Sequence, residues 1–135
     1  MSEFGIGELA RRAGVRVDTV RYYERHGLVT PLGRRASGYR RYGELQLARL
    51  RFIRRAKALG FSLDEIRELL LLSSRRDVGE VKRRAEAKLA DVKHRLTELE
   101  RIRDGLERLI AACPGHGRAA DCPILQALGY QELQP

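Results

Sequence analysis

The sequence predicts an almost entirely helical protein, an all-α fold with one small β wing. Apolar residues recur at helical spacing over most of the 135 residues, and only one segment rich in Gly, Pro and Arg interrupts that spacing. A second apolar stripe then continues through residues 81–113 without a proline. We therefore expect a winged helix-turn-helix unit at residues 1–75, a linker and long helix at 76–112, and a cysteine-containing loop and tail at 113–135.

Two short helices are predicted at the start of the chain. Residues 6–13 carry apolar side chains at helical spacing and end at Gly14, and residues 17–26 do the same and end at Gly27. Two short helices joined by a glycine-containing turn are typical of a helix-turn-helix, although other small helical proteins contain the same hairpin.

Residues 28–42 predict the wing. Pro31, Gly33 and Gly38 disfavour helix there, and two tyrosines alternate with four arginines, Arg34, Arg35, Arg40 and Arg41. Guanidinium groups bind phosphates in a bidentate manner, so this composition favours a phosphate-binding hairpin. A solvated loop with tyrosines packed on the helices is the alternative. We assign Tyr42 to the core and Tyr39 to function.

Residues 44–59 and the following segment predict two helices that build the core. Ser62 and Glu65 form a capping box at the start of the second helix. The acidic residues Asp64, Glu65 and Glu68 suit a helix N-terminus for electrostatic reasons, and no nucleophile, histidine or glycine-rich loop accompanies them. We therefore expect no enzyme.

A linker at residues 73–79 is expected to precede one long helix. Its apolar stripe continues for about four heptads, which is typical of a coiled coil. The stripe runs through Val81, Ala85, Leu89, Val92, Leu96, Leu99, Ile102, Leu106, Leu109, Ile110 and Cys113. A helix of this length measures about 50 Å, more than the first unit could cover by folding back, so a homodimer is favoured.

Two cysteines flank a flexible loop after the long helix. Eight residues, two of them glycines, separate Cys113 from Cys122, and a proline follows each cysteine. The chain lacks an apolar run that spans a membrane and the N-terminal pattern of a secretory signal, so we expect a cytoplasmic protein with reduced thiols. The pair is then either a metal-chelating loop or two small hydrophobic residues.

The number of ligands indicates which ion such a loop would bind. Two thiolates alone can hold a soft monovalent ion such as Cu(I). A structural zinc ion usually has four N or S ligands, so it would require His116, Asp121 or donors from a partner chain.

The net charge of +9 lies almost entirely in the first half of the chain. Residues 1–75 contain 16 Lys and Arg against 8 Asp and Glu, whereas residues 76–135 contain 11 against 10. This asymmetry predicts a nucleic-acid-binding unit joined to a nearly neutral unit, with a solvated basic surface as the alternative.

Several motifs in one order resemble the MerR family of bacterial transcription regulators. The segments are Ile6-Gly-Glu-Leu-Ala10, Val17-Asp-Thr-Val-Arg-Tyr-Tyr-Glu24, Gly27-Leu28, Arg34, Gly38-Tyr39-Arg40 with Tyr42, and Leu59-Gly-Phe-Ser-Leu-Asp-Glu-Ile66. The resemblance covers nearly the whole chain, and the cysteine segment is similar to the metal-sensing branch, closest to copper-efflux regulators.

The resemblance implies an antiparallel coiled-coil homodimer that binds double-stranded promoter DNA. Such regulators distort the promoter when they bind their effector, so that bacterial RNA polymerase can use it. The residues that match DNA-contacting positions, or lie beside them at the start of the recognition helix, are Arg16, Thr19, Arg21, Tyr22, Arg34, Tyr39 and Arg40. Cys113 and Cys122 match the metal ligands.

Three departures from the family pattern bear on function. Arg16 stands where a helix-capping Ser, Thr or Asn is common, and Val78 stands where sensors of divalent ions usually have a third cysteine. We therefore expect a sensor of Cu(I), or of Ag(I) or Au(I). The loop between the thiols is one residue longer than in copper sensors, which keeps a Zn(II), Cd(II) or Hg(II) sensor as an alternative. A metal-storage or delivery protein and a regulator for an organic or oxidative effector are further alternatives.

Overall fold

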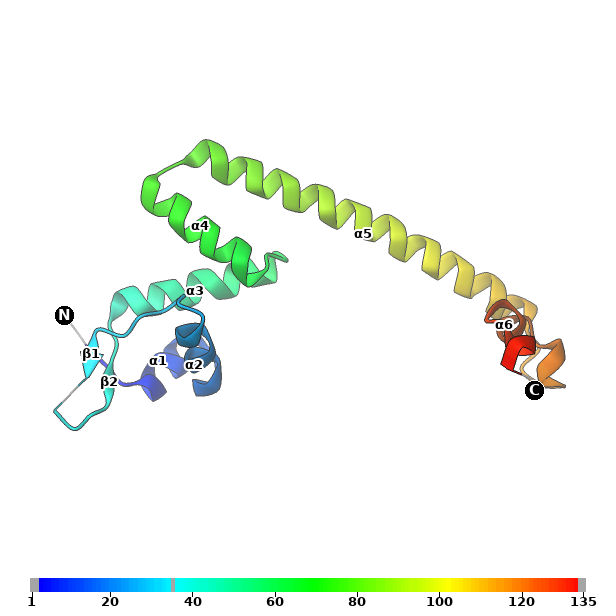
Figure 1. Cartoon of the computed structure of the whole chain (residues 1–135), viewed down its shortest axis with the longest axis horizontal. Helices are drawn as coiled ribbons and strands as arrows, with labels where there is room; N and C mark the ends of the chain where they lie inside the picture. The colour runs from blue at the N-terminus through cyan, green and yellow to red at the C-terminus, as the bar shows by residue number, and fades with distance from the viewer. Residues whose placement is uncertain (1–2, 35, 134–135) are drawn as a thin grey trace. The chain divides into compact units, whose positions relative to one another are not determined.

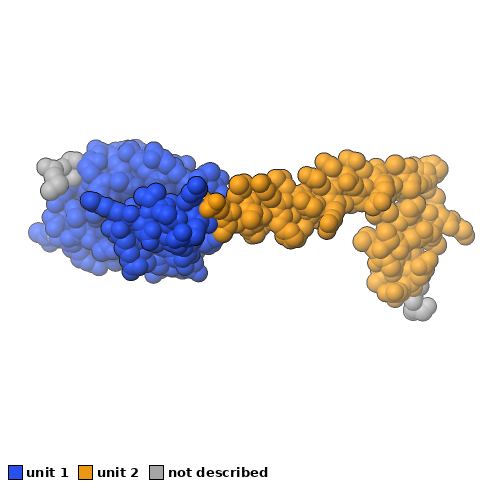
Figure 2. All heavy atoms as spheres, turned by 90° about the horizontal axis from the view of Figure 1, so that it is seen from above, with its two compact units in different colours: residues 1–84 blue, residues 85–135 orange. Residues whose placement is uncertain are grey.

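The computed structural model describes residues 3–34 and 36–133, so Arg35 of the expected wing and the N-terminal Met-Ser lie outside the described residues. The chain forms two compact units, residues 1–84 and residues 85–135, which Figure 2 shows in separate colours. The expected fold class is confirmed, because helices dominate both units and the described residues form one small two-stranded sheet. None of the helices in the described ranges has both the length and the apolar character needed to cross a bilayer.

The helix-turn-helix consists of α1 (Ile6–Ala13) and α2 (Val17–Arg25). Gly14 ends α1 with a left-handed φ of 71°, a conformation that glycine adopts without strain. The two helices pack on each other and α1 packs on α3 (Glu44–Ala58), as Figure 1 shows. The predicted bounds of both short helices are confirmed to within one residue.

The wing is an antiparallel hairpin of β1 (Gly33–Arg34) and β2 (Arg40–Arg41), with Arg34 opposite Arg40. Directly after β2, Tyr42 pairs with Phe4 through two backbone hydrogen bonds of 2.8 and 2.9 Å. The side chain of Tyr42 is fully buried, which confirms its assignment to the core.

The core of the first unit is completed by α3 and α4 (Leu63–Arg75). The capping box is confirmed: the Glu65 N–H donates to the Ser62 hydroxyl, and the Ser62 N–H donates to the Glu65 carboxylate. The fully buried aliphatic side chains of the unit include Leu9, Val20, Leu28, Leu50, Ile53 and Ile66.

The linker expected at residues 73–79 is wrong in extent. Helix α4 continues to Arg75 and α5 (Val78–Ala112) begins three residues later, so only Arg76 and Asp77 connect them. The serines at the end of α4 do not stop the helix, because the Ser74 hydroxyl donates to the Leu70 carbonyl, 3.2 Å away. Arg76 takes the left-handed conformation that ends α4, and the Asp77 carboxylate accepts the Glu80 N–H at 3.1 Å.

Helix α5 has 35 residues and none of them is buried within the single chain. Most of the predicted apolar stripe is therefore exposed, Leu96 for example by 52%, whereas Val81, Leu109 and Cys113 are half-buried. After α5, the second unit contains a short 3₁₀ turn, η1 (Ala119–Asp121), helix α6 (Pro123–Ala127) and a second turn, η2 (Tyr130–Leu133).

Candidate nucleic-acid interface and thiol pair

The second helix of the helix-turn-helix presents cationic and aromatic side chains to solvent. Arg21 and Tyr22 are exposed on α2, and Thr19 is half-buried. Arg16 is the N-cap of α2 but its side chain makes no capping bond; its guanidinium instead pairs with Asp18 at 3.7 Å. The Arg16 side chain therefore does not cap α2, as expected where an arginine replaces a capping Ser, Thr or Asn.

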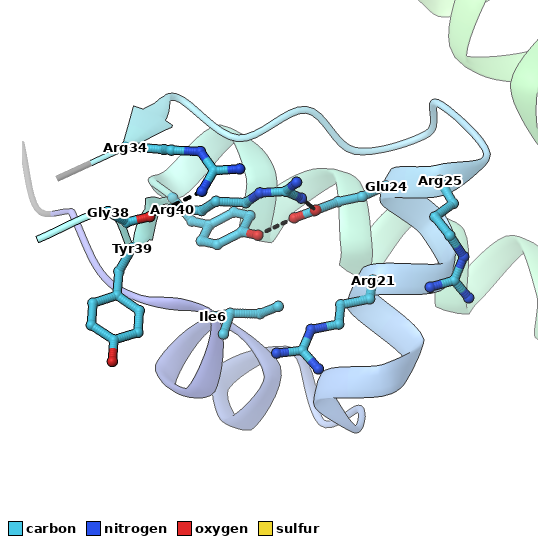
Figure 3. A pocket seen from close by; sticks show the side chains of 9 residues that line it. Ile6, Arg21, Glu24, Arg25, Arg34, Gly38, Tyr39 and Arg40 are labelled. Carbon is cyan, nitrogen blue, oxygen red and sulfur yellow. Dashed lines mark hydrogen bonds and ion pairs between the residues drawn. The ribbon is translucent and has the colours of Figure 1, made fainter.

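The wing and α2 together enclose a shallow hollow of about 460 Å³ (Figure 3). Its lining residues are Ile6, Arg21, Glu24, Arg25, Arg34, Gly38, Tyr39, Arg40 and Tyr42. The Arg34 guanidinium donates to the Gly38 carbonyl at 3.1 Å, which fixes the turn of the hairpin. Tyr39, at the rim of the hollow, is 74% exposed. The structure therefore brings four of the seven predicted DNA-binding residues, Arg21, Arg34, Tyr39 and Arg40, to the hollow or its rim.

A buried carboxylate lies behind this cationic surface. Glu24 of α2 accepts a hydrogen bond from the Arg40 guanidinium at one oxygen and from the Tyr42 hydroxyl at the other. The Glu24 side chain is only 6% exposed, whereas that of Arg40 is 45% exposed. Burial, and then the hydrogen bond to Glu24, hold the pKa of Tyr42 above its ordinary value, so the phenol remains a donor.

Glu24 was not among the residues predicted to have a function. The sequence does contain an indication of its position: Glu24 lies four residues after the buried Val20 and therefore on the inward side of α2. A glutamate at such a position requires a partner, since an unpaired carboxylate is costly to bury.

The arrangement can bind a polyanion. Four guanidinium groups, those of Arg21, Arg25, Arg34 and Arg40, surround the hollow from α2 and the hairpin. Each guanidinium has five N–H donors in a planar fork that matches phosphate oxygens.

The two thiols of the second unit lie together. Cys113 follows the last turn of α5, Cys122 precedes α6, and their sulfur atoms are 3.7 Å apart. A disulfide has its sulfurs about 2.05 Å apart, so both cysteines are free thiols, and both are half-buried. The backbone N–H of Leu125, in the first turn of α6, is the main cause that lowers the pKa of Cys122.

The other residues proposed as ligands are not brought into a cluster with the thiols. Asp121 is engaged by Arg118, whose Nε lies 2.9 Å from the carboxylate, and His116 is exposed in the loop. Over residues 3–34 and 36–133, no three His, Cys, Asp or Glu side chains are grouped for metal binding. Val78, in place of a third cysteine, is exposed in the first turn of α5.

Comparison with known proteins places the chain in a family. Residues 4–72 match the family described as MerR HTH family regulatory protein, and residues 47–109 match the one described as MerR, DNA binding. The mercuric resistance operon regulatory protein of Serratia marcescens is 42% identical over 123 residues, which are 91% of this chain and 85% of that protein.

Two solved structures extend the likeness. The transcription regulator PbrR691 from Ralstonia metallidurans CH34, in complex with lead(II), is 39% identical with a TM-score of 0.81, covering 91% of this chain and 97% of that one. HiNmlR, a MerR family regulator lacking the sensor domain and bound to promoter DNA, is 27% identical with a TM-score of 0.57, covering 82% and 85%. The chain therefore belongs to the MerR family of helix-turn-helix transcription regulators.

Proposed function

We propose that this chain is a homodimeric, cytoplasmic, metal-responsive regulator that binds promoter DNA and activates transcription by distorting it when Cys113 and Cys122 bind a soft monovalent ion. Cu(I) is the proposed ion, with Ag(I) and Au(I) as chemical equivalents. The observation that carries the proposal is the pair of free thiols 3.7 Å apart, with no third His, Cys, Asp or Glu grouped with them among the described residues.

The DNA-binding part of the proposal rests on α2 and the hairpin. Arg16, Thr19, Arg21 and Tyr22 belong to α2 or its N-cap, and Arg34, Tyr39 and Arg40 belong to the wing. We assign the arginines to phosphate and base-edge contacts, because guanidinium groups suit both. The solved relative bound to promoter DNA supports this assignment.

The dimer follows from the exposed stripe of α5. Leu89, Leu96, Leu99 and Leu106 are more than half exposed in the single chain, and exposed leucines in one row are favourable to bury. The stripe has coiled-coil spacing, so a second copy of α5 is the proposed partner, in the antiparallel arrangement that the family implies.

The donor set fits a soft ion. Bonds between zinc and thiolate are about 2.3 Å long, and two bonds of that length reach sulfurs up to about 4.6 Å apart. The 3.7 Å separation therefore lies within reach of one ion. Two thiolates from one chain are enough ligands for a soft monovalent ion, so no third donor is needed. A bound ion would link the end of α5 to the start of α6.

In such a regulator, the difference in effector-binding free energy between the two conformations must be comparable with the free energy of bending the promoter. Smooth bending of a site costs on the order of 1–6 kcal/mol. To move a two-state equilibrium almost completely, the activating conformation must bind the effector about 10⁴-fold more tightly than the other one. Cys113 and Cys122 would supply this difference in effector affinity. RNA polymerase is the proposed partner that binds the distorted promoter.

A sensor of divalent soft ions is the second candidate. The relative named for mercuric resistance and the structural neighbour in complex with lead(II) favour it. This alternative needs a donor beyond the two thiols, for which His116, Asp121 or a partner-chain group is available. Zn(II), Cd(II) and Hg(II) are the ions to compare.

The deciding experiment is in vitro transcription from the promoter upstream of the chain's own gene, with each metal added in turn under anaerobic conditions. We expect activation by Cu(I), Ag(I) and Au(I). Activation by Zn(II), Cd(II) or Hg(II) alone would establish the divalent alternative. A storage or delivery protein would bind metal but leave no promoter footprint and show no steep dependence of DNA binding on salt.

A further inference from the structure

The contact between α2 and the wing carries an inference about a residue outside the predicted interface. Glu24 lies on α2 and Arg40 lies on β2, so their ion pair joins the two elements that carry the predicted DNA-binding residues. Tyr42 binds the other oxygen of the same carboxylate and is itself fixed by backbone pairing to Phe4. The carboxylate is therefore held in place by a rigid part of the core.

Arg40 is left with donors to spare. Among the bonds between described residues, Nη1 of its guanidinium donates to Glu24, while an arginine has five N–H donors. The side chain remains 45% exposed and lines the hollow together with Arg21 and Arg34. A guanidinium fixed at one end by a buried carboxylate presents its other donors in a fixed direction, and less conformational entropy is lost when they bind an anion.

We propose that Glu24 is a positioning residue for DNA recognition: it orients Arg40 towards the bound DNA and sets the register of the wing relative to α2. The inference rests on the proposed DNA-binding function and goes beyond it. Glu24 does not contact DNA. Its negative charge would by itself repel a polyanion, so its effect is on which DNA is bound, rather than on attraction to DNA in general.

Two opposite effects of Glu24 make the proposal testable. Removing the charge raises the attraction to any duplex, because one anion is lost beside the hollow. Removing the positioning lowers the affinity only for the duplex that requires α2 and the wing in register. The ratio of affinities for promoter and for scrambled DNA separates these effects.

The experiment compares variants of the full chain by their dissociation constants for two duplexes of equal length. One duplex contains the chain's own upstream promoter and the other contains the same bases scrambled. Glu24→Gln keeps an oxygen that accepts from Tyr42 but loses the ion pair with Arg40. We expect it to lower the preference for the promoter by about tenfold, the scale of a hydrogen bond to a charged group.

A matched control removes the same charge from the same helix. Asp18→Asn neutralises an exposed carboxylate of α2 that pairs with Arg16 and does not touch the wing. We expect this variant to bind both duplexes slightly more tightly and to keep the promoter preference. If Asp18→Asn and Glu24→Gln have equal effects, Glu24 acts only as a counter-charge and the proposal is overturned.

A double-mutant cycle separates positioning from a merely structural role. With Arg40→Gln already present, Glu24→Gln should change the promoter preference by less than about twofold, because the side chain that it positions is gone. An equal loss with and without Arg40 would overturn the proposal. Glu24→Asp keeps the charge on a side chain that is one methylene shorter, so it should bind scrambled DNA normally and lose promoter preference, and it keeps the test open if Glu24→Gln does not fold.

The outcomes also separate this inference from the proposed function. A wild-type chain that does not distinguish the two duplexes, with or without Cu(I), contradicts the proposed function itself. A wild-type preference that Glu24→Gln leaves unchanged contradicts only the role of Glu24.

Discussion

The sulfur atoms of Cys113 and Cys122 lie 3.7 Å apart, although eight residues separate the two cysteines along the chain. The intervening loop is held by its own contacts, since Arg118 pairs with Asp121 and the Gln126 amide donates to the Ala120 carbonyl at 2.7 Å. The thiols are thus brought together by residues that are not themselves proposed as Cu(I) ligands.

Replacing either cysteine should separate metal response from DNA binding. We expect Cys113→Ser and Cys122→Ser to lose metal-dependent transcription completely, because one thiolate cannot hold the ion, and to keep promoter affinity within about twofold, the scatter expected between sites without shared contacts. His116→Ala is the control and should respond normally. Transcription assays and anaerobic metal titration measure the two properties, and loss of the response in His116→Ala would support the divalent alternative.

Adding a thiol at the start of α5 should change the ion that the protein prefers. Val78 is 76% exposed, so Val78→Cys disturbs no core contact. In the proposed antiparallel dimer this thiol supplies a third donor, and we expect affinity for Zn(II) and Cd(II) to rise at least about tenfold, since a structural zinc ion takes four ligands and Cd(II) resembles it. Val78→Ser is the control. Equal affinities in both variants, measured by competition titration, would argue against a contribution from this position.

A charge in the apolar stripe of α5 should dissociate the dimer. Leu96→Glu places one carboxylate on the stripe of each chain. We expect the dissociation constant to rise by about 100-fold or more, because two leucines lose about 1.5–3 kcal/mol of burial each. Ala90→Glu introduces the same side chain about 120° around the helix and should leave the dimer intact. Sedimentation measures both, and equal dissociation constants would contradict pairing through the stripe.

Arg21 should contribute to the dependence of DNA binding on salt. If each copy of Arg21 neutralises one phosphate, Arg21→Ala lowers the slope of log K against log salt by about two per dimer. Arg103→Ala in α5 removes a cation that pairs with Asp104 and should leave the slope unchanged. Fluorescence anisotropy at several salt concentrations gives both slopes, and a wild-type slope in Arg21→Ala would exclude a phosphate contact.

The capping box of α4 should contribute measurably to stability. Ser62→Ala removes the acceptor of the Glu65 N–H, which typically costs about 1 kcal/mol, or a decrease in Tm of about 4 °C in a unit of this size. Ser73→Ala, in the last turns of α4, is expected to keep or slightly raise Tm, because alanine favours helix. Thermal unfolding monitored by circular dichroism measures both.

Most of the fold could be predicted because local signals decide it. Gly14 ends α1, Ser62 begins α4, and the apolar period identifies α5, and each of these signals acts within a few residues of the boundary that it sets. The connection between α4 and α5 was predicted too long, because Ser73, Ser74 and Gly79 suggest a loop. Helical hydrogen bonding and the cap at Asp77 override that local preference.

The site was predictable only in part. Exposed arginines in a Gly- and Pro-rich segment indicate phosphate binding from composition alone. The ion pair between Glu24 and Arg40 joins residues 16 positions apart, so it depends on how the wing packs on α2 and no local pattern reveals it. The spacing of Cys113 and Cys122 allowed a chelating loop, and the packing of the loop determines that the sulfurs meet.

The short connection at Arg76 and Asp77 limits how α5 can begin. Arg76 has φ 56°, a strained value for a residue with a side chain, and just beyond it the Arg84 guanidinium of α5 is bound to Glu68 of α4. If the first turn of α5 changes direction, only the backbone torsions of these two residues can absorb the rotation. Any rotation that these torsions do not take up is transmitted to α4. Arg76→Gly would weaken this coupling between α5 and α4 without removing a proposed metal ligand.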